Sequence, residues 1–504
     1  MDIMKGRVDT LPNEMHKKKN IFIFMTDHQR VDMAPPFHKC LTPNLDMFMQ
    51  EAVAFTNMTC PSPHCCPSRA TFFSGLYPSQ HSVWNNVMVG NTLSRGLAAN
   101  VRLFSEDLRD AGYRLFFSGK WHLSNEEGPE SRGFETVYHK QTYTGIQSAA
   151  EARIPDCSEW AYYERPLCTE DTPRGEGEIV RPGYPRYALY GTSETPFDDE
   201  QVVRAAEKHI GEVLPGVEDP WCYYVGPLGP HDPYFVPQRF LDMYDIAEIE
   251  LPDNYHDDMM DKPELYRKTR DRFAQLTDQE HREAVRHFLA FCTYEDYLFG
   301  RMISALKKAG LYEDSIILYT SDHGDYVGAH GLWTKGLPCF MEAYRIPFLL
   351  RIPGGKHNEV SDVPALLADA APTILELAGI QVDRPMTGVS LVPYVLGGQL
   401  PARREYRFTQ SNGNELYGIQ RSVFNENWKY VFNGFGYDEL YDLKNDPGEL
   451  HNLASDSRYK DVIRQMVREL WRFARQTQDT YINPYIMIAH MPYGPGILLE
   501  EERT

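Results

Sequence analysis

A short segment of the chain combines residue types and a spacing that could support chemistry on an anion. Cys65, Pro67, Ser68 and Arg69 form the pattern Cys-x-Pro-Ser-Arg. Because proline fits the first position of a helix, the pattern predicts that a helix begins at Pro67 and that Cys65 lies just outside it. The free N–H groups and the dipole of a helix N-terminus favour negative charge, and Arg69 adds a positive charge one turn later. A reactive group at position 65 would therefore face a pocket that stabilises anions.

Other ionisable residues follow apolar segments that have the composition of buried strands. Asp27 follows residues 20–25, and His231 follows residues 221–225. Parallel strands of one sheet end along the same edge, where open α/β folds bind their ligands, so these side chains could meet there. The same reasoning applies to Lys120 and His122 after residues 113–118, to Asp322 and His323 after residues 315–319, and to Lys335 shortly afterwards.

Together these groups suit a site that binds a divalent cation and cleaves an anionic ester. Asp27, Asp322 and His323 offer oxygen and nitrogen ligands to a hard or borderline metal ion. The lysines would surround the transferred group with positive charge, and the imidazoles could transfer protons. A single aspartate after a strand is more often a helix cap, and a single lysine or histidine there is more often a solvated loop residue. The prediction therefore depends on the joint pattern.

The elements that would position these residues indicate an α/β protein. The apolar segments alternate with helical patterns, which predicts a large, mixed, mostly parallel central sheet flanked by helices. From about residue 400, short alternating segments predict a smaller α+β subdomain with a short antiparallel sheet, followed by a long amphipathic helix. We expect residues 1–18 to be a leader or a disordered arm, residues 19–398 to form the catalytic domain, and residues 399–504 to form the C-terminal subdomain.

Residues 139–200 interrupt this pattern. They are rich in Tyr, Pro, Gly and Arg and show little periodicity. Long loops of this kind are usually either functional or disordered, and the aromatic content argues against disorder. We expect this segment to be an insertion that forms a wall of the substrate pocket.

Composition and charge narrow the class of partner. The chain has 504 residues and a formal net charge of −20. An acidic surface argues against a nucleic-acid partner, and any site for an anion must be locally basic. No apolar run is long enough to span a membrane, residues 1–20 lack a signal-peptide core, and the nine cysteines show no disulfide-like spacing. We expect a cytoplasmic protein without a membrane partner, although removal of a signal peptide would leave the same sequence. Association of the chain into a homo-oligomer is a further possibility.

The segment around Cys65 resembles the maturation signature of the type I sulfatases, which belong to the alkaline phosphatase superfamily. In that family, a formylglycine-generating or other maturing enzyme oxidises the cysteine to formylglycine (3-oxoalanine). The resemblance runs from about residue 20 to residue 453 and implies an alkaline-phosphatase-like fold and hydrolysis of a small anionic sulfate ester. The Tyr, Trp and Arg residues of the insertion at 139–200 favour a sulfated sugar as that ester. Further blocks that resemble the family are Gly-Lys-Trp-His at 119–122, His-Asp-Pro-Tyr at 231–234, Asp-His-Gly at 322–324 and Leu-Tyr-Asp-Leu at 440–443.

The resemblance also implies how the nucleophile would act. Formylglycine derived from Cys65 would attack sulfur as a hydrated aldehyde, with Asp322 assisting its deprotonation. Arg69 and Lys120 would stabilise the hydrated form and its anion. His122 would accept the proton of the second hydroxyl, so that the covalently bound sulfate is expelled.

The same resemblance implies a substrate site and a metal site. Lys120, His231 and Lys335 would bind the sulfate, and His231 or Lys335 would protonate the leaving alcohol. One divalent metal ion would be held by Asp27, His28, Cys65, Asp322 and His323.

One position departs from the family pattern. Many sulfatases have two consecutive aspartates after the first strand, whereas His28 and Gln29 follow Asp27 here. Either residue could replace the missing carboxylate, or the metal could have fewer protein ligands. Calcium is our first expectation, but nitrogen donors at positions 28 and 323 would favour manganese or zinc, and magnesium is a further option. Related hydrolases of phosphonate and phosphate esters also lack the second aspartate, so such an activity is the main alternative. A catalytically silent protein with this fold is another.

Overall fold

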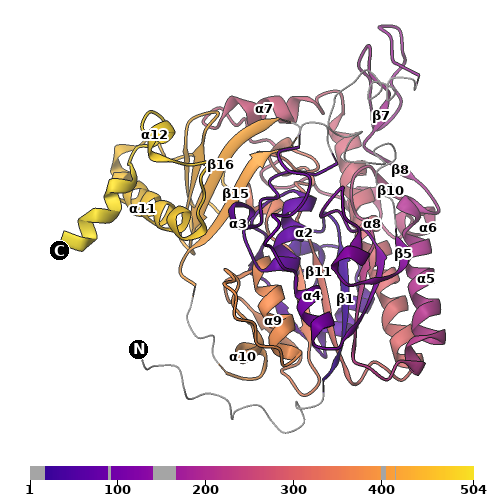
Figure 1. Ribbon diagram of the computed structural model, residues 1–504. Coiled ribbons are helices and arrows are strands. Elements are labelled where there is room, and N and C mark those ends of the chain that lie inside the picture. The colour runs from indigo at the N-terminus through magenta and orange to yellow at the C-terminus, as the bar shows by residue number, and fades with distance from the viewer. Residues whose placement is uncertain (1–17, 89–91, 140–165, 399–403, 415, 504) are drawn as a thin grey trace.

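The computed structural model describes residues 18–88, 92–139, 166–398, 404–414 and 416–503 (Figure 1). Almost all of the predicted leader, residues 1–18, lies outside the described residues, as do residues 140–165 of the predicted insertion. Within the described ranges, no helix combines the length and the apolar character needed to cross a membrane.

Eight strands form the central sheet, in the order β13-β2-β12-β11-β1-β9-β4-β5. The predicted mostly parallel sheet is confirmed: β1 lies between β11 and β9 and is parallel to both, and β4 and β5 continue the parallel part. Strand β12 is antiparallel to both of its neighbours. The strands are β1 (Asn20–Thr26), β2 (Val53–Phe55), β4 (Arg114–Gly119), β5 (Glu135–His139), β9 (Trp221–Gly226), β11 (Ser315–Ser321), β12 (Phe348–Arg351) and β13 (Glu359–Ser361).

Helices cover both faces of this sheet, which explains why β1 is apolar along nearly its whole length. Ile21, Ile23 and Met25 point into one core layer, and Phe22 and Phe24 point into the other. The first layer packs under α2, α4 and α9, and the second packs under α1, α5 and α8. These helices are α1 (Pro43–Met49), α2 (Cys65–Ser74), α4 (Phe104–Asp110), α5 (Asp199–Glu212), α8 (Asp278–Lys308) and α9 (Ala370–Leu377).

Shorter elements connect the main ones. Three two-stranded sheets are present among the described residues, formed by β3 with β14, β8 with β10, and β6 with β7. Their bounds are β3 (Met58–Thr59), β6 (Glu178–Ile179), β7 (Tyr187–Ala188), β8 (Tyr190–Thr192), β10 (Tyr234–Val236) and β14 (Ala365–Leu366). The shorter helices are α3 (Pro78–His81), α6 (Gln238–Leu241), α7 (Glu264–Asp271), α10 (Val392–Val395) and α12 (Pro484–Met487).

The C-terminal part has its own sheet and core, as the alternating segments predict (Figure 1). Strands β15 (Arg407–Gly413), β16 (Tyr417–Phe424), β17 (Trp428–Asn433) and β18 (Glu439–Asp442) form an antiparallel sheet in chain order. Helix α11 (Lys460–Thr477) packs on β16 and β17. Ile482, Met487 and Met491, which follow α11, join the same core, so this end of the chain packs on its own sheet.

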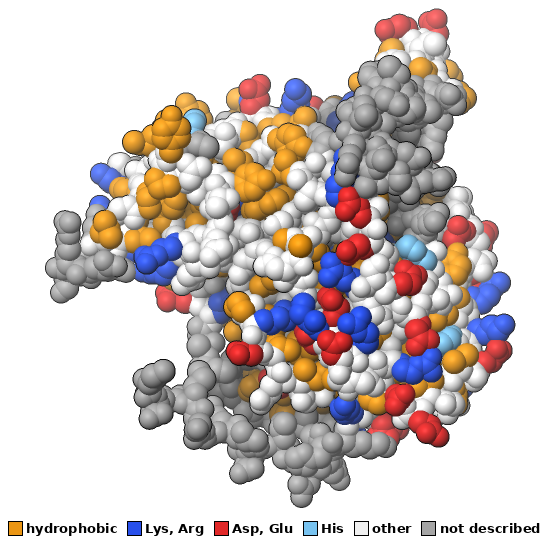
Figure 2. Space-filling view, in the orientation of Figure 1, with side chains coloured by type: hydrophobic (Ala, Val, Ile, Leu, Met, Phe, Trp, Pro, Cys, Tyr) orange, Lys and Arg blue, Asp and Glu red, His pale blue; other side chains and the backbone are white. Residues whose placement is uncertain are grey.

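The two parts differ in surface character. Figure 2 shows hydrophobic side chains gathered over the C-terminal part, whereas acidic and basic side chains are mixed over the rest of this face. The exposed large side chains of the C-terminal part include Tyr417, Tyr437, Tyr485 and Ile488. The acidic excess of the chain is thus not concentrated in one acidic patch on this face.

A buried ion pair holds the chain after α11 against the C-terminal sheet. The Arg421 guanidinium in β16 donates to the Asp479 carboxylate at 2.5 and 3.1 Å, and both side chains are 1% exposed. We expect Asp479→Ala to lower the free energy of unfolding by about 3–5 kcal/mol, because it leaves the Arg421 charge buried without its partner. Urea denaturation followed by circular dichroism measures this change.

The matched control for this prediction is Asp314, whose exposed carboxylate pairs with Lys19 at 3.2 Å. Asp314→Ala should leave the urea midpoint almost unchanged, because exposed pairs contribute little. A shift at Asp479 no larger than the shift at Asp314 would show that the buried pair is not stabilising.

Candidate active site

The helix that carries the Cys-x-Pro-Ser-Arg pattern begins two residues earlier than predicted. Helix α2 starts at Cys65, and His64 before it is extended. Pro67 is therefore the third residue of the helix. Its missing N–H is harmless there, because the first four N–H groups of a helix have no partner within the helix. Cys65 still lies at the positive end of α2, and all ten residues of the helix are buried.

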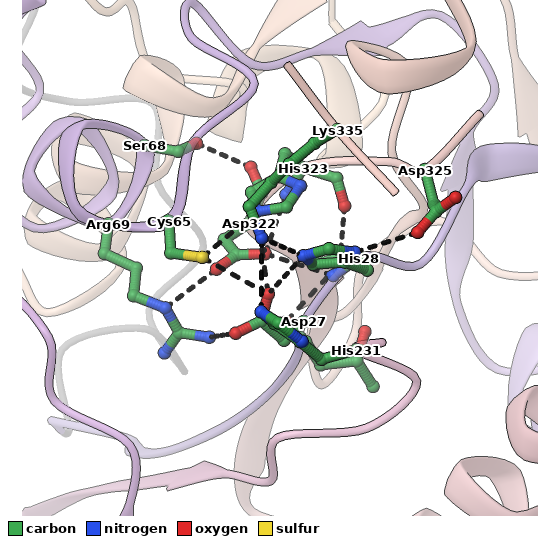
Figure 3. A network of polar contacts seen from close by, with 12 residues as sticks. Asp27, His28, Cys65, Ser68, Arg69, His231, Asp322, His323, Asp325 and Lys335 are labelled. Atoms are coloured by element: carbon green, nitrogen blue, oxygen red, sulfur yellow. Dashed lines mark hydrogen bonds and ion pairs between the residues drawn. The ribbon is translucent and has the colours of Figure 1, made fainter. Parts of the chain in front are cut away.

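Cys65 points towards the ends of β1 and β11 (Figure 3). Its Sγ lies 3.7 Å from Asp27 Oδ1 and 3.3 Å from His323 Nε2. These two residues follow neighbouring parallel strands, and the pairing of the strands brings them to one edge of the sheet. Donor atoms of Asp27, His28, Cys65 and His323 all lie within 4.8 Å of one another. We call these four residues the donor cluster.

Hydrogen bonds set the orientation of both imidazoles in the donor cluster. His323 Nδ1 lies 2.8 Å from the Gly324 carbonyl oxygen, and His28 Nδ1 lies 2.9 Å from Asp325 Oδ2. The Gly324 carbonyl can only accept, and Asp325 accepts in its ionised form, so with Asp325 ionised each Nδ1 carries the proton and each Nε2 presents its lone pair to the cluster. Burial lowers the pKa of both histidines, and the Lys335 charge lowers that of His28 further. Two neutral imidazoles are thus available as metal ligands.

Asp325 is the side chain that orients His28. Its carboxylate also accepts a hydrogen bond from the Tyr234 hydroxyl, which lies 3.0 and 2.9 Å from its two oxygens, and another from the Val327 N–H at 3.0 Å. Burial, together with repulsion from Asp232, raises the pKa of Asp325 to about 7, whereas the hydrogen bonds from Val327 and Tyr234 favour its ionised form.

The structure distinguishes between the two residues that could replace the missing carboxylate. Gln29 turns away from the donor cluster, because its Oε1 accepts hydrogen bonds from Thr26 Oγ1 at 2.9 Å and from the Tyr319 hydroxyl at 2.6 Å. His28 Nε2 instead lies 3.8 Å from Asp27 Oδ1. The His28 backbone has a φ of 67°, in the left-handed region that is uncommon for residues other than glycine.

Arg69 joins the two carboxylates that follow β1 and β11. Its Nε donates to Asp322 Oδ2 at 2.8 Å, and its Nη2 donates to Asp27 Oδ2 at 3.4 Å. Its Nη1 donates to the Tyr224 hydroxyl at 2.9 Å and to the Lys120 carbonyl at 3.2 Å. The Arg69 side chain is fully buried. These contacts indicate that Arg69 holds the carboxylates and the end of β4 in place.

A glycine at the end of β4 lets Lys120 approach Asp27. Gly119 has a φ of +110°, and a Cβ there would lie 2.0 Å from the Gly226 carbonyl oxygen on β9, so a larger residue would push the strands apart. Lys120 Nζ contacts Asp27 Oδ2 directly, and both side chains are fully buried. Burial by itself would raise the pKa of Asp27, but Lys120 and Arg69 hold it well below its usual range.

Three further predicted residues surround the donor cluster. His122 is buried, and burial, followed by the charges of Lys120 and Arg69, lowers its pKa, so its imidazole is neutral and could accept a proton. Lys335 Nζ contacts His28 Nε2 and lies 3.2 Å from His231 Nε2. A metal ion bound by His28 Nε2 would therefore require Lys335 Nζ to leave its contact with this nitrogen.

A cavity of about 470 Å³ adjoins the cluster at His231 and Lys335. The described part of the predicted insertion supplies one of its walls, through Ile179, Arg181, Tyr184, Pro185 and Tyr187. The cations beside the donor cluster are Arg69, Lys120 and Lys335. Next to a cavity of this size, they could bind a small anionic ester and stabilise the charge that develops when the ester bond breaks.

Sequence reasoning did not identify three residues of this site. Asp325 follows His323 by two positions, and a carboxylate that close to a metal-ligand candidate was a usable signal. Asp232 directly follows His231, and its Oδ2 accepts a hydrogen bond from the Tyr187 hydroxyl at 3.1 Å. Arg272 lines the cavity from the turn after α7, where no strand end or motif marks it.

Comparisons with known proteins match most of the chain. The family model Sulfatase matches residues 19–380, and the model N-sulphoglucosamine sulphohydrolase, C-terminal, matches residues 328–476. The choline-sulfatase of Rhizobium meliloti (strain 1021) is 30% identical over 471 residues, which cover 88% of this chain and 83% of that protein. An uncharacterized sulfatase of Escherichia coli (strain K12), YidJ, is 27% identical over 482 residues, which cover 92% and 89%.

Solved structures share the fold. A phosphonate monoester hydrolase of Agrobacterium radiobacter superposes with a TM-score of 0.73 and 22% identity, covering 91% of this chain and 96% of that chain. A protein in complex with its substrate D-glucosamine-2-N,6-O-disulfate superposes with a TM-score of 0.71 and 21% identity, covering 92% and 99%. Both likenesses extend over the catalytic and the C-terminal parts.

Proposed function

The chain belongs to the sulfatase family of the alkaline phosphatase superfamily, whose members are sulfuric ester hydrolases, and on this premise we propose that it hydrolyses the sulfate ester of a sugar or another small alcohol. One observation carries the proposal. Cys65 lies at the start of a buried helix, 3.3 Å from His323 and 3.7 Å from Asp27, and the cluster opens through His231 and Lys335 into a cavity. A nucleophile, cations and proton-transfer groups are therefore close together.

We propose that a sulfatase-maturing enzyme converts Cys65 to formylglycine. The hydrated aldehyde would supply the nucleophilic hydroxyl and would carry the sulfate covalently until its release. The N-terminus of α2 would favour the negative charge of this group. The neutral imidazole of His122 would accept a proton, and Lys120, held at Asp27, would add positive charge beside the nucleophile. Lys335 and His231, which face both the cluster and the cavity, would bind the sulfate oxygens and protonate the leaving alcohol.

We propose that the donor cluster, together with Asp322, holds one divalent metal ion. The donor set fits such an ion, because Asp27 offers a carboxylate oxygen and both histidines direct Nε2 towards it. The ion would help to neutralise the negative charge of the sulfate and the nucleophile. Calcium is the expectation from family resemblance, whereas two imidazole nitrogens favour manganese or zinc. Elemental analysis of purified protein would identify the ion.

Asp325→Ala should weaken metal binding although Asp325 is not a proposed ligand. The carboxylate orients the His28 ring through the 2.9 Å contact with Nδ1, so we expect its loss to reduce the affinity for Mn²⁺ by about 10- to 100-fold. Isothermal titration of metal-free protein measures this affinity independently of hydrolysis. Asp257→Ala is the control, because Asp257 makes the equivalent 2.7 Å contact with His330 outside the cluster. Equal affinities of the wild type and Asp325→Ala would contradict the orienting role.

Release of inorganic sulfate tests the proposed function directly. Protein expressed with a maturing enzyme and loaded with metal should release sulfate from an aryl sulfate or from sulfated monosaccharides. If no sulfate is released from any of these esters, the proposal fails. An intact Cys65 thiol in protein purified from its native host would instead favour a catalytically silent protein.

Hydrolysis of a phosphonate or phosphate ester is the second candidate. Two observations favour it: His28 stands where many sulfatases have a carboxylate, and a phosphonate monoester hydrolase has the same fold. A sulfate monoester and a phosphonate monoester both carry a single negative charge, so the same cations could bind either. The ratio of kcat/KM for an aryl sulfate and the matching aryl phosphonate monoester distinguishes them. A strong preference for the phosphorus ester would overturn the first proposal.

A further inference from the structure

One wall of the cavity carries two arginines that form no ion pair with a carboxylate of the described residues. Arg181 lies between β6 and β7, and Arg272 lies directly after α7. Arg181 Nη2 donates to the Arg272 carbonyl at 2.9 Å, and Arg272 Nη2 donates to Thr334 Oγ1 at 2.9 Å. Since Thr334 precedes Lys335, the two guanidinium groups belong to the same end of the cavity as the proposed sulfate-binding lysine.

Arg272 keeps a donor that the described structure does not use. Its Nε is buried and has no hydrogen-bond partner among the described residues. The rest of the Arg272 side chain is only half-buried and lines the cavity. An anionic group of a ligand in the cavity could therefore accept hydrogen bonds from its guanidinium group.

The acidic residue of the cavity does not cancel this positive charge. Asp232 Oδ2 accepts from the Tyr187 hydroxyl, and its Oδ1 lies 3.3 Å from His231 Nδ1. The cavity lining has three lysine or arginine residues, Arg181, Arg272 and Lys335, against one aspartate, Asp232. This local excess is notable in a chain whose formal net charge is −20.

We infer that the alcohol released from the substrate carries a second anionic group, a carboxylate or another sulfate, which binds at Arg272 and Arg181 while the reacting sulfate lies at Lys335 and His231. The inference rests on the proposed function of the same site. A guanidinium group can bind a carboxylate or a sulfate through two parallel hydrogen bonds, which a neutral hydroxyl cannot reproduce. A cavity of about 470 Å³ has room for a monosaccharide that carries both groups. A leaving group with a positive charge, such as choline, is disfavoured by the same arginines.

A series of aryl sulfates that differ in one substituent tests the inference. The meta substituent is a carboxylate, a second sulfate, a neutral carboxamide or a cationic trimethylammonium group. We expect kcat/KM to be about 10- to 100-fold higher for the carboxylate or the sulfate than for the carboxamide, and lowest for the trimethylammonium compound. Whichever anionic member is preferred identifies the source of the second charge.

Arg272→Gln should remove this preference. We expect it to lower kcat/KM for the anionic compound by about 10- to 100-fold and to change that for the carboxamide by less than about threefold. Arg282→Gln is the matched control, because Arg282 is an exposed arginine of α8 that does not line this cavity. It removes the same net charge and should leave the preference unchanged. If Arg272 served only to hold Thr334, its loss would affect all members of the series equally, and that result would overturn the inference.

A binding measurement separates this inference from the proposed function. Cys65→Ala protein cannot turn over a sulfate ester by the proposed route, so isothermal titration with the carboxylate and carboxamide compounds reports binding alone. We expect tighter binding of the carboxylate, and equal binding of the two compounds when Arg272→Gln is added. Charge discrimination in binding without any turnover by the matured wild type would refute the proposed function only. Turnover without charge discrimination would refute the inference only.

Discussion

Cys65→Ala should lower sulfate-ester hydrolysis by about 10,000-fold or more, because it removes the proposed nucleophile from a site whose other groups remain in place. Alanine fits the buried first turn of α2, and the contacts of Arg69 with Asp27 and Asp322 do not involve position 65. The measurement is kcat/KM for an aryl sulfate, with matured wild-type protein as the reference. Residual activity within about tenfold of the wild type would exclude Cys65 as the nucleophile.

The neighbouring cysteine provides the matched control. Cys66 is equally buried, but its Sγ accepts a hydrogen bond from the Val87 N–H at 3.4 Å and is not part of the donor cluster. Cys66→Ala removes a sulfur of the same size and should cost about 1 kcal/mol of stability while most activity remains. Mass spectrometry of the wild-type peptide should show an aldehyde in place of the thiol at position 65 only. Conversion of Cys66, or of neither residue, would contradict the assignment.

Asp27→Asn should destabilise the fold and also abolish most activity. The Asp27 carboxylate contacts Lys120 and lies 3.4 Å from Arg69, and all three side chains are fully buried. The substitution removes the carboxylate that Lys120 contacts and leaves Asp322 as the carboxylate partner of Arg69, so we expect the free energy of unfolding to fall by about 3–5 kcal/mol. It also removes a proposed metal ligand, so activity should fall by about 100-fold or more. Urea denaturation in a metal chelator separates the first effect from metal binding.

The pH of that experiment follows from the pKa of Asp27. Because the folded-state pKa lies well below the ordinary value of 3.8, the stabilising contribution of the ionised carboxylate is complete above the unfolded-state pKa. It is lost only as the pH falls through the folded-state pKa, so denaturation at pH 7 measures it in full. A double variant with Lys120→Met should recover part of the lost stability, because it removes the cation that has lost this carboxylate. Additive losses from the two substitutions would contradict the proposed coupling.

The order and type of the main elements could be predicted from local sequence. The apolar run of β1 predicts a strand buried on both faces, and the core layers on either side of it confirm this. The long helix α8 begins after Thr277, whose hydroxyl accepts a hydrogen bond from the Glu280 N–H, a local capping signal. The first residue of α2 could not be predicted as well. A proline is tolerated anywhere in the first turn, so the sequence pattern does not distinguish Pro67 as first residue from Pro67 as third.

The residue types at the ends of the parallel strands determined which groups could meet. Parallel strands of one sheet place their carboxyl ends at the same edge, and this does not depend on the packing of the loops. The sequence therefore determined the candidates Asp27, Lys120, His231 and His323. It did not determine which neighbour of Asp27 turns inward. The left-handed backbone of His28 and the acceptor supplied by Asp325 decided that, and both depend on the path of the chain after the strand.

The tertiary structure alone decided what lies beyond the strand ends. Arg181 and Arg272 are 91 positions apart, and the hydrogen bond between them brings them to one cavity wall. Neither arginine belongs to a sequence motif at the end of a strand. An isolated arginine in a loop usually faces solvent, so the sequence does not mark either residue as part of a site. Side chains on loops meet only where packing of the whole chain brings the loops together. Residue spacing and hydrophobic periodicity describe local structure, so they do not predict which loops come together.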